Sequence, residues 1–280
     1  THIYTGFWEN WIQRFYIFER SAPPALVDSL DVEFRPGTIV PWSIERDFLV
    51  TRDRVLDLSD PVHPVPIGRL LNPLDFNNGV YDLATRPFPG SETDVLVGTF
   101  QGKGFPIDTL AFYRVSREQG VERISGDQVD YGFQLTFDDT RDLLYRTHWL
   151  PREDPIWVYD ISDPYNPMRL HRHLFDEPNS ATRAIRDGIV CLDGILHVFD
   201  SNLYGLNWNF RATPLWFDGD RFVPVGAPLH SRVRPLRPSG QAGYLPTRGW
   251  YDGSALLTYD PPPLPRREEC CFSDGGPRRD

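Results

Sequence analysis

The chain has 280 residues, 14% of them aromatic, and a formal net charge of −10. This acidic balance argues against sequence-independent binding to nucleic acid, which needs clustered cations, and gives no reason for attraction to an anionic membrane. The sequence has no stretch of about 18 apolar residues, so we expect no membrane span.

Short apolar segments separated by Gly, Pro and Asp turns follow one another along the chain, and helix signals are nearly absent. This pattern predicts an all-β protein with many short strands. In chain order, the expected strands are residues 3–11, 15–18, 25–27, 38–44, 47–51, 79–86, 94–100, 110–116, 121–124, 132–137, 143–149, 185–191, 195–199, 214–217, 222–225, 243–251 and 255–259, with two more strands in each of the segments 55–67 and 157–170.

The segments 55–67 and 157–170 are internal repeats of the form strand, Ser-Asp-Pro turn, strand. In such a turn the Asp side chain binds the backbone and Pro stops the strand ladder. The repeats match at Asp57 and Asp160, Ser59 and Ser162, Asp60 and Asp163, Pro61 and Pro164, and Pro64 and Pro167. The offset of 103 residues equals two units of about fifty, slightly above a usual propeller blade.

Three further strand pairs follow the same plan, at 15–27, 110–124 and 214–225. We interpret the five pairs as the outer strands of a β-propeller with about five four-stranded blades. The first blade lacks an inner strand, which residues 243–259 can supply, so that strands from both termini close the ring and remove the exposed sheet edge. One strand is left over, so six blades stay open. Residues 1–260 then form a single propeller domain, and residues 261–280 form a tail rich in Pro, Arg and Glu.

A family resemblance supports this fold. Residues 158–167, Val-Tyr-Asp-Ile-Ser-Asp-Pro-Tyr-Asn-Pro, resemble the LVIVD repeat, and residues 56–64 are similar to it. The resemblance implies a β-propeller. That family is tied to no single activity, so the resemblance assigns no functional residue.

The segments that lead into the expected inner strands are rich in aromatic, amide and arginine side chains. Small molecules bind at pockets with apolar walls and a few converging polar groups, and a propeller offers such a pocket at one mouth of its channel. The expected polar catalytic groups are Arg183, Arg248, Tyr81, Tyr131 and Asn78, and the expected substrate-binding residues are Trp42, Gln134, Tyr244 and Trp250. The alternative is that these aromatics cover blade junctions and the polar groups cap turns.

This pocket favours a cofactor-independent enzyme that acts on a small, largely apolar metabolite by cyclisation, addition or hydrolysis. Aromatic walls would fold the substrate, and the polar donors would stabilise negative charge that develops on oxygen. We expect no cofactor and no metal. The alternative is a non-catalytic propeller that binds a ligand, a glycan or a protein.

A lesser alternative is a glycosidase with paired carboxylates. The candidate acids are Glu9, Glu45, Asp47, Asp82, Glu153 and Asp154. A calcium site built from Glu45, Asn78 and Asp82 lacks a supporting loop motif. His171 and His173 share one face of an expected strand, as a metal site requires, but an exposed strand pair explains them as well.

Three cysteines, Cys191, Cys270 and Cys271, allow one disulfide from Cys191, a bridge between the adjacent pair, or three thiols. Their spacing matches no zinc motif. The sequence begins at Thr1 and its single methionine is Met168, so we expect that the initiator was removed, either by processing, as in a mature secreted protein, or by design of a trimmed chain. The cations comprise one lysine, Lys103, and 28 arginines, a bias typical of GC-rich coding sequences that also suits forked hydrogen bonds to oxygen acceptors.

Overall fold

The structure is a computed structural model of the whole chain, and the residues that it describes form β-strands and the turns between them. It describes residues 2–9, 12–19, 25–33, 42–51, 54–70, 80–102, 107–130, 132–148, 155–174, 184–202, 209–227, 229–231, 249–251 and 256–258. These residues form 22 strands. Within them there is no helix of the length and apolar character that a membrane crossing needs.

Four antiparallel sheets each follow four consecutive strands of the chain. The first contains β4 (Trp42–Glu45), β5 (Phe48–Thr51), β6 (Val55–Asp57) and β7 (Val65–Gly68). The second contains β8 (Val80–Pro87), β9 (Val95–Gly102), β10 (Ile107–Ser116) and β11 (Gly120–Asp130). The third contains β12 (Gly132–Phe137), β13 (Leu143–His148), β14 (Ile156–Asp160) and β15 (Met168–His173). The fourth contains β16 (Ala184–Leu192), β17 (Ile195–Asn202), β18 (Asn209–Phe217) and β19 (Phe222–Pro224), with β20 (Leu229–Ser231) also paired to β18.

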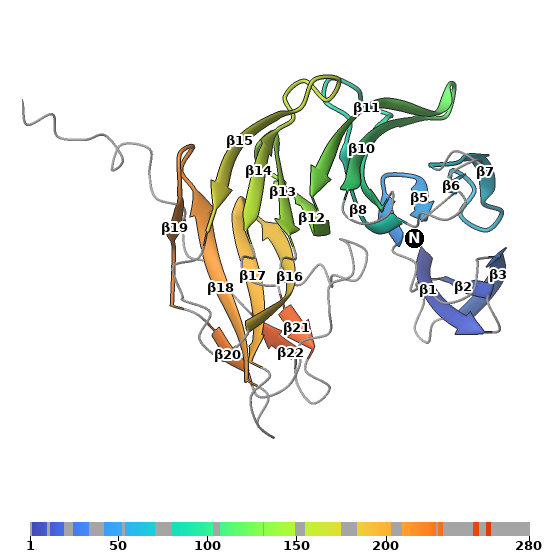
Figure 1. Cartoon of the computed structure of the whole chain (residues 1–280). Helices are drawn as coiled ribbons and strands as arrows, with labels where there is room; N and C mark the ends of the chain where they lie inside the picture. Colours follow the sequence, from blue (N-terminus) through green and yellow to red (C-terminus); the bar gives the residue numbers. More distant parts are fainter. Residues whose placement is uncertain are drawn as a thin grey trace, which may run out of the picture.

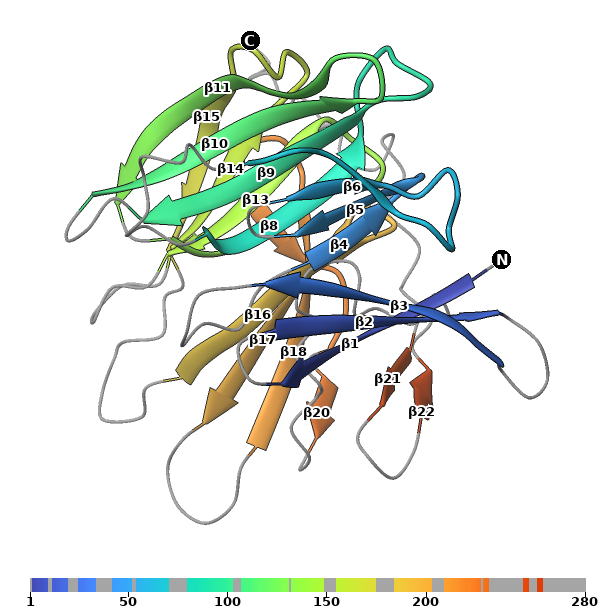
Figure 2. The same ribbon diagram turned by 90° about the vertical axis from the view of Figure 1, so that its right-hand side faces the viewer.

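Two smaller sheets come from the two ends of the chain. One contains β1 (His2–Glu9), β2 (Ile12–Glu19) and β3 (Ala25–Glu33), and the other contains β21 (Gly249–Tyr251) and β22 (Leu256–Thr258). The sheets follow one another around an arc, from β18 through β14 and β10 to β5 and β2 (Figure 1). In a view turned by 90°, the second and third sheets lie one behind the other (Figure 2). The chain therefore has the expected all-β, propeller-like architecture of four-stranded antiparallel sheets.

Each pair of neighbouring sheets encloses an apolar core. Phe48 and Val50 of the first sheet pack with Val97 of the second. The second and third sheets share a core that includes Phe112 and Phe137. The third and fourth share another, built from Leu143, Tyr145, Ile156, Val158, Ile189, Leu196, Leu215 and Phe217 among others. Side chains alternate between the two faces of a strand, so one strand can feed the cores on both sides of its sheet.

Close approach of the second and third sheets depends on Gly98 in β9. A Cβ atom at this position would lie 3.2 Å from Cζ of Phe137 in β12. This distance is tighter than normal packing, so the bare backbone of Gly98 makes room for the Phe137 ring.

The two repeats have the same turn geometry. Asp57 accepts a hydrogen bond from the Ser59 amide at 2.8 Å, and Asp160 accepts one from the Ser162 amide at 2.8 Å. Asp60 and Asp163 likewise accept from the amide two residues ahead, each at 3.0 Å. The predicted strand–turn–strand equivalence of the two segments is thus confirmed. Moreover, β8, β12 and β16 begin 52 residues apart, at positions 80, 132 and 184.

Strand β11 is much longer than predicted. The polar residues after Ile124 suggest a turn, yet β11 continues to Asp130 and pairs with the start of β10. Contacts with the third sheet explain the extension. The Ser125 hydroxyl donates to the Pro164 carbonyl at 2.7 Å, and Asp127 pairs with Arg169 at 2.6 Å. Tertiary partners here outweigh local strand propensity.

A buried histidine makes the stability of the fold depend on pH. His197 in β17 is fully buried, and burial lowers its pKa from 6.5 to about 4. Between these values the unfolded chain binds a proton that the folded chain excludes. Stability is therefore complete above pH 6.5 and falls as the pH drops toward 4, by up to about 3 kcal/mol.

Urea unfolding of the wild type and of His197→Leu, measured at intervals from pH 4 to pH 7.5, checks this expectation. The variant has an apolar side chain at this buried position. Its free energy of unfolding should lack the pH dependence that the proton excluded by His197 causes in that range. Equal slopes in the two proteins would contradict the assignment.

Candidate functional site

The inner strands of the arc run in the same direction. β8 lies beside β4 and β12, and β12 lies beside β16. Gln134 and Thr136 of β12 accept hydrogen bonds from the amides of Ile189 and Cys191 in β16, at 2.9 and 3.1 Å. The two pairs advance together along both strands, so β12 and β16 are parallel.

The other inner strands are also parallel to their neighbours. Asp82 near the start of β8 accepts from the Leu135 amide at 2.8 Å, while Arg86 near its end reaches the carbonyl of Arg141, just past β12. In the same way, Ser43 of β4 bonds the Thr85 hydroxyl at 2.8 Å. The starts of the inner strands therefore gather at one end of the arc, and the hairpins that follow them gather at the other.

Two predicted substrate-binding residues have described side chains. Gln134 is almost fully buried and its Oε1 holds β16 against β12. Trp42 is half-buried and packs on Leu49, Leu56 and Leu58. These contacts fit the alternative in which polar groups and aromatics support blade junctions.

The remaining predicted site residues are placed only in part. Tyr81 is the second residue of β8 and Trp250 lies in β21, but their side chains are not described. The other predicted residues, Asn78, Tyr131, Arg183, Tyr244 and Arg248, lie outside the described residues. The carboxylates of Glu9, Glu153 and Asp154 are not described either.

Among the candidate acids, Asp47 pairs with Arg117 at 2.8 Å and so bridges the first and second sheets. Glu45 is half-buried at the end of β4, and burial raises its pKa above the usual value, against the opposing charges of Arg46 and Arg86. A carboxyl with a raised pKa can serve as a proton donor. The structure thus brings Glu45 and Asp47 to the hairpin end and Asp82 to the opposite end of the inner strands.

Sequence analysis missed the most densely connected polar group, at the hairpin between β12 and β13. Asp138 is fully buried. Its Oδ1 accepts from both donors of Thr140 and from the Arg141 amide, at 2.8 to 3.0 Å. Its Oδ2 accepts from Nε and Nη2 of Arg141 and from the Tyr145 hydroxyl, at 2.8 to 3.0 Å. The sequence carries a turn signal here, since Asp138-Asp139-Thr140-Arg141 directly follows an apolar strand.

This group also latches the third sheet to the fourth. Arg141 donates to the carbonyls of Phe217 and Gly194, and its guanidinium lies 5.9 Å from the Trp216 ring. Asp139 accepts from the amides of Asp193 and Gly194 at 2.7 and 2.9 Å. The hairpin tip of one sheet is therefore anchored on the hairpin tip of the next.

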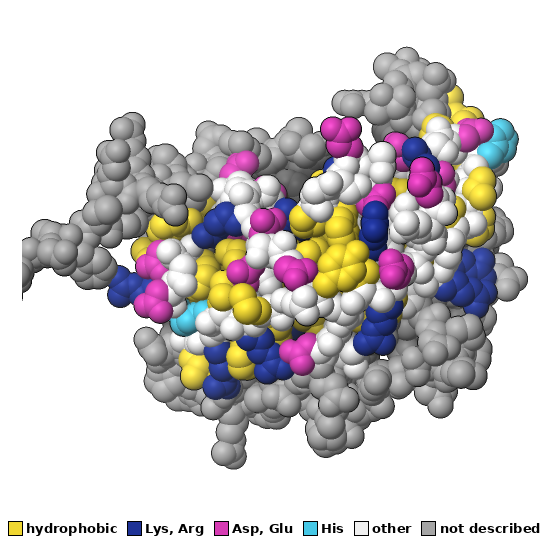
Figure 3. All heavy atoms as spheres, turned by 90° about the horizontal axis from the view of Figure 1, so that it is seen from above, with side chains coloured by type: hydrophobic (Ala, Val, Ile, Leu, Met, Phe, Trp, Pro, Cys, Tyr) yellow, Lys and Arg dark blue, Asp and Glu magenta, His cyan; other side chains and the backbone are white. Residues whose placement is uncertain are grey.

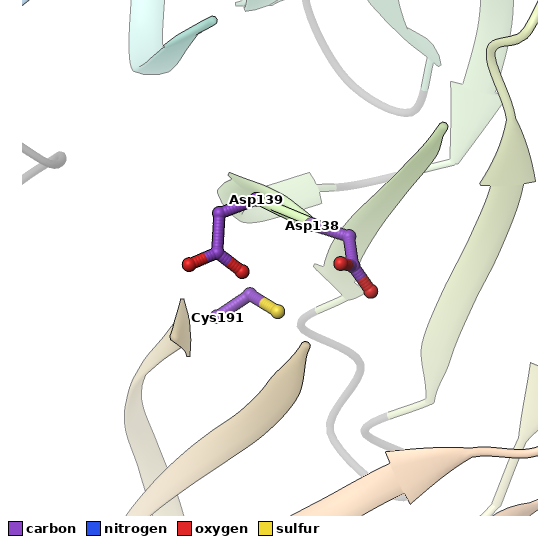
Figure 4. A group of neighbouring side chains, drawn as sticks. All are labelled: Asp138, Asp139 and Cys191. Atoms are coloured by element: carbon purple, nitrogen blue, oxygen red, sulfur yellow. The ribbon is translucent and has the colours of Figure 1, made fainter. Parts of the chain in front are cut away.

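Asp138, Asp139 and Cys191 bring three potential metal-binding atoms within 4.8 Å of one another (Figure 4). Their chemistry does not suit a cation. Both oxygens of Asp138 already accept hydrogen bonds, and Arg141 supplies its counter-charge. Burial and the two neighbouring carboxylates raise the pKa of the Cys191 thiol, whereas a metal binds the thiolate. The trio is best described as part of the interblade latch, with Cys191 as a buried free thiol.

His171 and His173 share one face of β15, as predicted. Their rings lie 6.3 Å apart and pack on the fourth sheet, with Phe222 at 6.3 and 5.2 Å respectively. The pair thus contributes to packing between the third and fourth sheets.

Comparison with known proteins identifies structures with a similar fold, but it identifies no activity. No protein-family model matches the chain, and no curated protein matches it. Solved structures do resemble it. One is the crystal structure of a protein of unknown function from Desulfotomaculum acetoxidans, with a TM-score of 0.53 and 12% identity over 84% of this chain and 69% of that one. At this identity the similarity concerns the fold alone.

The latch predicts a strong effect of removing one charge. In Asp138→Asn, one acceptor becomes a donor that faces Arg141 or Tyr145, and the half-buried Arg141 guanidinium loses its counter-charge. We expect the free energy of unfolding to fall by about 3 kcal/mol. Urea denaturation measures this change. Asp163→Asn, the same substitution in an exposed turn, is the control and should change stability far less. Equal effects of the two substitutions would contradict the latch.

Proposed function

We propose that the chain is a closed β-propeller that acts as a cofactor-independent enzyme on a small, largely apolar metabolite, at the end of the ring where the inner strands begin. The supporting observation is the parallel direction of the inner strands, which gathers their starts at one end of the arc. At the hairpin end, Asp47, Asp139 and Arg141 are engaged in contacts between neighbouring sheets. The predicted polar residues flank the opposite end.

Ring closure is supported by buried side chains on the outward faces of the arc. Leu49 and Leu56 of the first sheet are buried on the face opposite the core shared with the second sheet. Val190 and Ala212 are buried in the fourth sheet, in a cluster separate from the core shared with the third. In Figure 1, β21 and β22 lie on the side of β18 toward β1–β3. We therefore assign β1–β3 and a strand from residues 249–258 to one shared fifth blade.

Two truncations test closure and the domain limits. A chain that ends at residue 260 lacks only the proposed tail and should keep the melting temperature of the full chain. A chain that ends at residue 242 also loses the closing strands, exposes the sheet edge and should unfold at a much lower temperature, or fail to fold. Calorimetry of the purified proteins measures both. Equal melting temperatures in all three would rule out closure by the C-terminal strands.

The placement of the site follows from chain positions. Tyr131 and Arg183 immediately precede β12 and β16, and Asn78 precedes β8 by two residues. Arg248 immediately precedes β21. Parallel inner strands begin at one end of the arc, and the proposal brings these residues from different blades together there. Five blades thus supply one composite site from positions that are far apart in the sequence.

The proposed chemistry uses the side chains of this site directly. Trp42, Tyr244 and Trp250 wall the pocket and hold an apolar substrate in a folded conformation. Arg183, Arg248, Tyr81, Tyr131 and Asn78 donate hydrogen bonds to an oxygen atom that gains negative charge in the transition state. Gln134 supports the strand from which the Tyr131 segment departs.

The test combines a metabolite screen with single substitutions. A pool of small apolar metabolites is incubated with the protein, and consumed and formed compounds are identified by mass spectrometry. Tyr81→Phe, Arg183→Gln and Arg248→Gln should each lower kcat by about 10²-fold or more, as loss of one oxyanion donor does. Arg221→Gln, an exposed arginine in the turn between β18 and β19, is the control and should leave kcat unchanged.

Each result has a definite meaning. A compound that is retained but not converted, with retention lost in the same three variants, supports the binding alternative over the enzyme. Retention and conversion that are unchanged in all three variants would overturn the site. Conversion that depends on Glu45 or Asp82 and releases a sugar would support the glycosidase instead.

A further inference from the structure

One buried hydroxyl of the third sheet has no hydrogen-bond partner. Thr147 in β13 is 3% exposed, and among the described residues it is one of two threonines whose buried Oγ1 has no partner, Thr109 in β10 being the other. A hydroxyl that loses water and gains no other partner destabilises the folded chain. Valine has nearly the same shape and would avoid this loss. The hydroxyl at position 147 therefore indicates a partner that does not belong to the chain.

Thr147 lies at the end of the arc where the inner strands start. β13 runs antiparallel to β12, so the last residues of β13 lie beside the first residues of β12. His148, the next residue of the chain, pairs with Gly132 at the start of β12. Thr147 is thus beside the segment that contains Gln134, at the end where the proposed site lies.

The side chain of Thr147 faces the fourth sheet. Alternate residues of a strand share a face, and Tyr145, two residues earlier, belongs to the core between the third and fourth sheets. Ile156, the residue of β14 that pairs with Thr147, belongs to the same core. Gln134 also reaches toward the fourth sheet, where its Oε1 accepts from the Ile189 amide. The unsatisfied hydroxyl therefore lies in the junction between these two sheets.

Two residues of the proposed site flank the same junction. Tyr131 immediately precedes β12 and Arg183 immediately precedes β16. β12 and β16 are the inner strands that meet in this junction. A ligand held by Tyr131 and Arg183 would have the Thr147 hydroxyl on the side of the core.

The surroundings of this hydroxyl favour a neutral oxygen atom as its partner. The core that Thr147 faces is built from apolar and aromatic side chains. An ionised group would lose its hydration there and gain no counter-charge from a hydroxyl. On the face seen from above, acidic and basic side chains are interspersed (Figure 3), so the described surface there has no region of a single sign that would attract a charged ligand. A carbonyl or hydroxyl group on an apolar molecule fits both conditions.

We propose that Thr147 is a specificity-determining residue that binds a carbonyl or hydroxyl oxygen on the apolar body of the substrate; this inference rests on the function proposed above. The threonine hydroxyl can donate to a carbonyl, and it can donate to or accept from an alcohol. A substrate analogue without the oxygen binds less well, because it leaves the buried hydroxyl without a partner. The substrate class is thereby narrowed to ketones, alcohols and related compounds with an oxygen on an apolar skeleton.

A panel of matched compounds tests the specificity. It contains ketones and alcohols of the metabolite screen and the hydrocarbons of the same skeleton, such as menthone, menthol and p-menthane. Compounds retained by the full-length protein after gel filtration are measured by mass spectrometry. The wild type should prefer the oxygen-bearing members, and Thr147→Val should lower this preference about tenfold. Thr147→Ser keeps the hydroxyl and should keep the preference.

Thermal unfolding of the ligand-free proteins gives a second measurement. If the chain supplies no partner for the hydroxyl, Thr147→Val should melt about 2 °C or more above the wild type. Thr109→Val is the matched control. Thr109 lies in β10, the third strand of the second sheet, and shares a face with Ala111 in the core toward the first sheet. This control should raise the melting temperature in the same way and leave retention unchanged.

Three results would overturn the proposal. A lower melting temperature of Thr147→Val would mean that bound water already satisfies the hydroxyl in the ligand-free protein. An unchanged preference in Thr147→Val, in a protein whose retention Arg183→Gln abolishes, would overturn this inference alone and support the proposed site. A wild type that retains no compound of the panel or of the screen would overturn the proposed function and this inference together.

Discussion

Apolar faces packed sheet against sheet hold this molecule together. A fully buried Phe or Leu contributes about 1.5–3 kcal/mol, whereas a typical hydrogen bond contributes about 1 kcal/mol net. Each interface between neighbouring sheets buries many such side chains, among them Phe112 and Phe137 between the second and third sheets. Packing therefore supplies the stability, and it requires close approach, which is why Gly98 lies under the Phe137 ring.

Packing alone does not fix the relative position of two sheets, because apolar contacts have little directionality. The relative position of neighbouring sheets is fixed by hydrogen bonds from polar groups on the inner strands and their hairpins. Gln134 and Thr136 set the register of β16 along β12, and Asp138 with Arg141 locks the hairpin ends. An arginine reaches the next sheet at three successive junctions, from Arg46 to the Ser91 carbonyl, from Arg86 to that of Arg141, and from Arg141 to that of Gly194. Lysine, with one compact charge, could not hold an aspartate and a neighbouring carbonyl together in this way.

Strands were predictable wherever the apolar pattern is local. The predicted 132–137 strand coincides with β12, and the Ser-Asp-Pro turns were predictable because an aspartate, a small polar residue and a proline determine a turn by themselves. The length of β11 was not predictable, since Ser125 and Asp127 find their partners in another sheet. The contacts of the Asp138 latch with the fourth sheet were missed for the same reason, because Arg141 donates to a carbonyl 76 residues away. For the candidate site, sequence identified residues at the starts of the inner strands, while Gln134 shows that a polar residue there can be committed to the scaffold.

Because the inner strands run parallel, the two ends of the arc differ in the contacts they make. At the hairpin end, tight turns place aspartates and arginines of successive sheets within hydrogen-bonding distance, and a substitution there is felt in two sheets at once. At the other end, β4, β8 and β16 begin after connections of 8, 11 and 10 residues from the preceding sheet, whereas β12 follows β11 after one residue. Residues in the longer connections can change without disturbing the latches. A site that must fit one particular ligand is easier to build from such connections than from the latched hairpins. Near the starts of β8 and β12, the buried acceptors Asp82 and Gln134 each hold the neighbouring inner strand in position, so the scaffold is fixed up to the point where the connections begin.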